Sequence, residues 1–154
     1  MFLNALEVDV TLALDGAVIG TGIGAILLYA VLGVLMMLLG FYAVDLTTPG
    51  PLNRQVREGK PNAVIITAAG MLGIAFIVVM SIYISSGDLL DGLLTTLIFG
   101  VIGIIAQVLA ARLLEWVTGI DMGAVLAGET TVPQAYLVAV AHVALGLVVA
   151  VAIL

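Results

Sequence analysis

The chain has 154 residues, of which 64% are hydrophobic and 9% are charged, and its formal net charge is −6. Soluble domains carry about 25% charged residues, so this composition excludes an ordinary soluble domain and indicates an integral membrane protein. The absence of cysteine excludes disulfides, thiolate metal sites and thiol catalysis. Four basic residues are too few to give an electrostatic footprint for nucleic acid, so we expect no nucleic-acid partner.

The amino-terminal segment, residues 1–16, precedes the first long apolar stretch. It lacks the basic region and the small-residue cleavage site of a signal peptide, so we expect it to be retained. Its apolar residues alternate with Asn4, Glu7 and Asp9. This pattern suits a segment that lies along the outer membrane interface or docks on a partner.

Four apolar stretches are each long enough to cross a bilayer, because a hydrocarbon core of about 30 Å requires roughly 20 helical residues. They are Ala17–Val44, Pro61–Ile84, Leu89–Leu114 and Val132–Leu154. Pro61 and Pro133 suit the first turn of a helix, where the missing N–H would be unpaired in any case. The sequence therefore predicts an all-α membrane protein with four transmembrane helices.

Glycines follow one face of the first predicted span. Gly16, Gly20 and Gly24 recur at every fourth residue, which places three residues without a Cβ on one ridge of the helix. We expect this ridge to face another helix, either within the chain or in another subunit. Gly73, which follows Ala69 at the same spacing, predicts a second small surface in the next span.

The basic residues determine the expected orientation of the chain. They are Arg54, Arg57, Lys60 and Arg112. The first three lie between the first two spans and the last lies at the end of the third, so the positive-inside rule predicts cytoplasmic loops at 45–60 and 115–131 and both termini outside. The first three are candidates for contacts with anionic headgroups, or they act only as determinants of topology.

The two halves of the chain resemble each other. Two pairs of segments align, namely Leu32-Gly33-Val34-Leu35 with Phe99-Gly100-Val101-Ile102 and Pro61-Asn62-Ala63 with Pro133-Gln134-Ala135. An even number of spans in each half makes both halves enter the membrane in the same direction. We therefore expect two parallel two-helix repeats, residues 17–84 and 89–154, in a pseudo-twofold four-helix bundle.

Few polar side chains lie within the predicted spans, where an unpaired ionisable group costs on the order of 2.5–3.5 kcal/mol. Asp45 and Arg112 occupy equivalent positions in the two halves, near the cytoplasmic ends of the first and third spans. This equivalence predicts an ion pair between them. The alternative is that each side chain extends separately to the headgroups.

His142 is the single histidine and lies about 13 Å along its helix from Pro133, at 1.5 Å per residue. It is a candidate for proton transfer, haem ligation or quinone binding, and the alternative is a neutral imidazole hydrogen-bonded to a neighbouring group. Gln107 is its candidate partner, or it joins helices by hydrogen bonds. One histidine supplies at most one ligand, so we expect no metal site and no cofactor.

Motifs of phosphate binding, zinc hydrolysis and serine catalysis are absent, which predicts a protein without catalytic activity. Three functions remain open. The first is a structural or accessory subunit of a membrane complex, in contact with the lipid bilayer and with other subunits or a second copy. The second is a small ion or solute transporter or channel that uses the embedded polar residues. The third, a quinone- or lipid-associated redox accessory protein, depends on His142 alone.

Several short segments resemble the YjfL-like family. They are Gly40-Phe41-Tyr42 with Asp45, Thr48-Pro49, Gly59-Lys60-Pro61-Asn62-Ala63 and Ala68-Ala69-Gly70-Met71-Leu72-Gly73-Ile74-Ala75. That family consists of small bacterial inner-membrane proteins built from two copies of a two-helix domain, which is known as domain of unknown function 350. The resemblance covers nearly the whole chain after the amino-terminal segment. It implies a multi-pass protein of the bacterial plasma membrane and no established activity.

Overall fold

The structure, a computed structural model, describes residues 16–48, 50–85 and 88–154. These residues form helices and connections, with no strand among them. The helices are α2 (Gly16–Thr47), α3 (Leu52–Arg57), α4 (Pro61–Ile84), α5 (Leu89–Thr118), α6 (Met122–Ala127) and α7 (Pro133–Ala152). The predicted interfacial segment at the amino terminus lies, apart from Gly16, outside the described residues.

Four of these helices, α2, α4, α5 and α7, are long and apolar enough to cross a membrane, which confirms the predicted class. Two of them extend further than predicted, since α2 continues to Thr47 and α5 to Thr118. Charged side chains end an apolar stretch of the sequence, but they do not end the helix. The helix α5 ends only at Gly119, whose φ of 65° gives the left-handed conformation that closes a helix.

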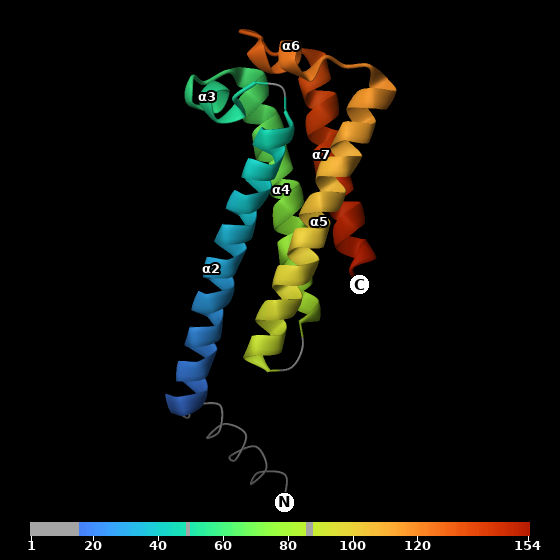
Figure 1. The fold of residues 1–154 in the computed structure, drawn as a ribbon. Coiled ribbons are helices and arrows are strands. Elements are labelled where there is room, and N and C mark those ends of the chain that lie inside the picture. The colour runs from blue at the N-terminus through green and yellow to red at the C-terminus, as the bar shows by residue number, and fades with distance from the viewer. Residues whose placement is uncertain (1–15, 49, 86–87) are drawn as a thin grey trace, which may run out of the picture.

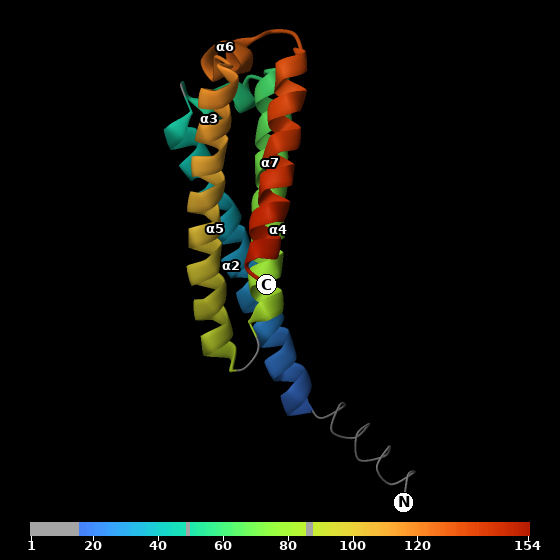
Figure 2. The same cartoon turned by 90° about the vertical axis from the view of Figure 1, so that its right-hand side faces the viewer.

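The short helices α3 and α6 lie together at one end of the molecule, and the last turn of α4 and the first turn of α5 lie at the opposite end (Figures 1 and 2). The two predicted cytoplasmic loops therefore share one end of the bundle. Which end faces the cytoplasm stays a prediction, and so does the pseudo-twofold relation between the two halves. The first part of α2 leans away from the other helices in both views.

Helix α4 lies at the centre of the bundle and contacts α2, α5 and α7. Its closest neighbour is α7, because Gly73 and Gly146 face each other across the contact. A Cβ placed on Gly146 would lie 2.6 Å from the carbonyl oxygen of Gly73. Only glycine at this crossing lets the two backbones come so close.

The end of the bundle near α3 and α6 has its own apolar core. Leu52 of α3 and Leu126 of α6 are each 1% exposed and pack with Ala63 of α4 and Val138 of α7. The two short helices are therefore fastened to the membrane-spanning helices by buried side chains. The prolines Pro61 and Pro133 stand in the first turns of α4 and α7, as predicted.

Candidate functional site

Asp45 and Arg112 do not pair in the structure. Nη1 of Arg112 lies 2.5 Å from Oε2 of Glu115, one turn further along α5. Oδ1 of Asp45 accepts a hydrogen bond of 3.2 Å from the backbone N–H of Asn53 in α3. The ion pair that the alignment of the two halves predicted is therefore not formed. Each side chain has a nearer partner, and for Arg112 this partner is at the i+3 spacing that brings helical side chains together.

Gln107 of α5 and His142 of α7 lie close together inside the bundle, but the imidazole is not the partner of the amide. Nε2 of Gln107 lies 3.3 Å from the carbonyl oxygen of Gly70 and 3.4 Å from that of His142, and it donates to both. Gln107 therefore joins α5 to α4 and α7. Both side chains are buried, and Oε1 of Gln107 and Nδ1 of His142 have no hydrogen-bond partner within the described part of the chain.

Gly73 of α4 makes the space for the amide of Gln107, and Gly70 lies beside His142, where a Cβ would make an ordinary van der Waals contact. A Cβ on Gly73 would lie 2.5 Å from Nε2 of Gln107, and a Cβ on Gly70 would lie 3.7 Å from Nδ1 of His142. Gly73 thus serves both the contact with α7 and the amide of Gln107. A cavity of about 10 Å³, lined by His142 and Glu115 among others, lies beside the cluster. A cavity of this size is about the smallest that can hold one water molecule.

Asn62, at the start of α4, makes a buried clamp that sequence reasoning missed. Its Nδ2 donates to the carbonyl oxygens of Val125, at 2.8 Å, and Thr130, at 2.9 Å. Its Oδ1 accepts from the backbone N–H of Val132 at 3.1 Å, and the residue is fully buried. An amide directly after a helix-starting proline in an apolar stretch was the available signal. These hydrogen bonds, together with an ion pair between Lys60 and Glu129, hold the segment from α6 to the start of α7 against the start of α4.

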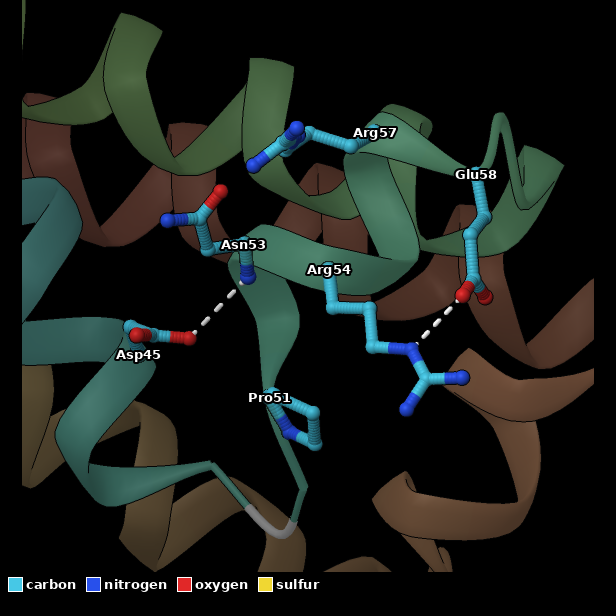
Figure 3. A pocket seen from close by; sticks show the side chains of 6 residues that line it. All are labelled: Asp45, Pro51, Asn53, Arg54, Arg57 and Glu58. Carbon is cyan, nitrogen blue, oxygen red and sulfur yellow. Dashed lines mark hydrogen bonds and ion pairs between the residues drawn. The ribbon is translucent and has the colours of Figure 1, made fainter.

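A polar pocket of about 520 Å³ lies beside α3 (Figure 3). Its lining residues are Asp45, Pro51, Asn53, Arg54, Arg57 and Glu58. Nε of Arg54 donates to Oε1 of Glu58 at 2.7 Å, which lowers the pKa of Glu58 and raises that of Arg54. This exposed interaction is complete at neutral pH and is lost as the pH falls through the lowered pKa of Glu58. The side chain of Arg57 has no such partner in the described chain.

The predicted glycine ridge of α2 meets no other helix of the described chain. A Cβ added at Gly20 or Gly24 would have no atom of another described helix within 4 Å, and the same holds for Gly22. Gly16 begins the helix. Of the two partners that the sequence left open for this ridge, a helix within the described chain is therefore excluded.

The model of a family described as a domain of unknown function, DUF350, matches residues 17–153. The chain is also 36% identical over 99 residues to a UPF0719 transmembrane protein of Mycolicibacterium paratuberculosis, covering 64% of this chain and 62% of that protein. UPF0719 transmembrane proteins of Mycobacterium bovis and Mycobacterium tuberculosis are 36% identical over 80 residues, covering 51% of this chain and 53% of each relative.

The chain thus spans less than two thirds of the length of these curated relatives. No solved structure matches it. The names of these relatives describe transmembrane proteins and give no activity. The family match covers all four long helices, agrees with the resemblance seen in the sequence, and shows that this chain belongs to the DUF350 family of small multi-pass membrane proteins.

Proposed function

We propose that this protein is a structural or accessory subunit of a membrane complex, without catalytic activity of its own, in the bacterial plasma membrane. The observation that supports this most directly is the exposed glycine ridge of α2, formed by Gly20 and Gly24. We infer that this ridge packs against a transmembrane helix of another subunit.

Helices in lipid gain little from the hydrophobic effect when they associate, so close van der Waals packing between small residues is a main source of their affinity. The chain uses this device where Gly73 faces Gly146. The ridge of α2 has the same chemistry but no partner in the described chain. In the most apolar part of α2, only 6% of the residues are buried inside the protein, whereas in the most apolar part of α4 the share is 44%.

A transporter that uses Asp45, Gln107, Arg112 and His142 has less support. Asp45 lines the pocket beside α3, whereas Gln107 and His142 are buried between α4, α5 and α7. The cavity beside His142 is about 10 Å³, which is small for a path that would admit a hydrated solute.

The proposal is tested by leucine substitutions on two opposite faces of α2. Gly20→Leu combined with Gly24→Leu fills the ridge, and Gly22→Leu is the matched control, because two residues further along a helix the side chain points to the other side. All three positions have open space, so neither variant should disturb the described fold.

The tagged variants are extracted from native membranes into lipid nanodiscs, and copurifying proteins are quantified by mass spectrometry. We expect the wild type and Gly22→Leu to retain the same foreign subunit at a constant ratio. The double variant should retain it about tenfold less, as a loss of about 1.4 kcal/mol produces. Equal retention by all three forms would contradict the role of the ridge.

A further inference from the structure

Three of the four basic side chains of the chain form ion pairs at the end of the bundle near α3. The ion pairs are Arg54 with Glu58, Lys60 with Glu129 and Arg112 with Glu115. The chain has four basic residues, and all of them lie in the described ranges. Arg57 is therefore the one cation there without a carboxylate partner, and it lines the polar pocket of about 520 Å³.

The charges around this pocket balance, since its lining contains two arginines and the carboxylates of Asp45 and Glu58. Arg54 and Glu58 neutralise each other. One guanidinium and one carboxylate then remain, and the Asp45 carboxylate uses Oδ1 for the backbone N–H of Asn53, which leaves Oδ2 for another donor. A balanced pocket does not select a purely anionic ligand. It suits a ligand that carries one negative and one positive group.

The unpaired groups lie on the same side of the pocket. Figure 3 shows the side chains of Arg57 and Asn53 extending to one side of α3, toward the side on which Asp45 lies, while Arg54 turns to the other side to meet Glu58. Arg57 and the amide of Asn53 provide donors for a phosphate, and the Asp45 carboxylate provides an acceptor for an ammonium group.

The pocket lies at the end of an apolar span, where we expect lipid headgroups. The apolar span of α2 ends at Leu46, directly after Asp45, and α3 follows with Leu52 buried in the core and its arginines outside. A volume of about 520 Å³ lies within the range of roughly 300–1,000 Å³ that is usual for small-molecule sites. A polar pocket at the end of a transmembrane helix is directly accessible to the headgroup of a neighbouring lipid.

We propose that this pocket binds the headgroup of phosphatidylethanolamine, with Arg57 and Asn53 on the phosphate and Asp45 on the primary ammonium. A primary ammonium donates hydrogen bonds to a carboxylate, whereas the quaternary ammonium of phosphatidylcholine has no N–H. None of the six lining residues is aromatic, so the pocket lacks the cage that recognises quaternary ammonium groups. The site is independent of the α2 ridge and of the proposed accessory function.

The test is native mass spectrometry of the purified full chain with phosphatidylethanolamine, phosphatidylglycerol and phosphatidylcholine at equal concentration. Arg57→Gln removes the phosphate donor and Asp45→Asn removes the charge that faces the ammonium group. Asn keeps an oxygen that accepts from Asn53, so the backbone contact survives. Lys60→Gln is the charge control, because it removes one cation near α3 whose side chain lies outside the pocket lining. It also breaks the ion pair with Glu129, so the thermal midpoints of Lys60→Gln and Arg57→Gln are compared with that of the wild type.

We expect the wild type and Lys60→Gln to prefer phosphatidylethanolamine. Arg57→Gln should bind it about tenfold more weakly, as expected for one lost charge-assisted hydrogen bond. Asp45→Asn should lower the binding of phosphatidylethanolamine relative to phosphatidylglycerol. Equal losses in Arg57→Gln and Lys60→Gln, or a wild-type preference for phosphatidylglycerol, would overturn the proposal. Displacement of the lipid by free phosphoethanolamine at similar concentration would overturn the assignment to a lipid.

Discussion

Asn62 shows how one buried amide can order a whole end of the molecule. Its three hydrogen bonds reach a carbonyl of α6, a carbonyl of the following loop and the N–H of Val132, directly before α7. The starts of α4 and α7 could be predicted, because a proline acts on the helical turn in which it stands. The role of Asn62 could not, because its partners are more than 60 residues away in the sequence. The ion pair predicted between Arg112 and Asp45 was wrong because of a local contact. Glu115, three residues further along the same helix, binds the guanidinium of Arg112.

Asn62→Ala should lower the stability of the fold. It removes the partner of three backbone groups, of which the carbonyl oxygen of Val125 belongs to a buried hydrogen bond and the groups of Thr130 and Val132 belong to part-buried ones. A buried group left unpaired costs about 1–3 kcal/mol, and a part-buried group costs less because water can reach it. Asn53→Ala is the control, since the Asn53 side chain is exposed and the bond to Asp45 uses its backbone N–H. Thermal unfolding in detergent, followed by circular dichroism, should show a lower midpoint for Asn62→Ala. Equal midpoints for the two variants would refute the clamp.

Among the elements, α4 and α7 form the tightest pair, and glycine decides how closely they approach. The positions of the four long helices could be predicted from apolar length, which is a local property of the sequence, although α2 and α5 extend beyond the predicted ends. Their pairing could not, since Gly73, Gly103 and Gly146 look alike in sequence to the exposed glycines of α2. Only the three-dimensional contacts distinguish a glycine that faces a backbone from one that faces open space.

Gly146→Ala should therefore destabilise the bundle. Its Cβ would lie 2.6 Å from the carbonyl oxygen and 2.7 Å from the carbonyl carbon of Gly73, and a backbone cannot turn aside as a side chain can. Overpacking of this kind costs about 1–3 kcal/mol. Gly22→Ala, which meets nothing within 4 Å, should leave stability equal or slightly higher because alanine favours helix. Unfolding by sodium dodecyl sulfate measures both, and equal stability of the two variants would contradict the packing argument.

For the whole molecule, the bundle is compact around α4 and open along α2. The glycine ridge of α2, which meets no other described helix, and the small cavity beside His142 support the proposed role in assembly over the alternative of transport. The family match and the four long helices agree with a multi-pass protein. We propose on this basis that the chain assembles with other subunits of a membrane complex.

The most direct test is the mass of the intact particle, extracted from native membranes into lipid nanodiscs and analysed for its components. The accessory role predicts a particle that contains this chain and a foreign membrane subunit in a fixed ratio. A particle that contains only this chain, as a monomer or a homo-oligomer, would contradict it.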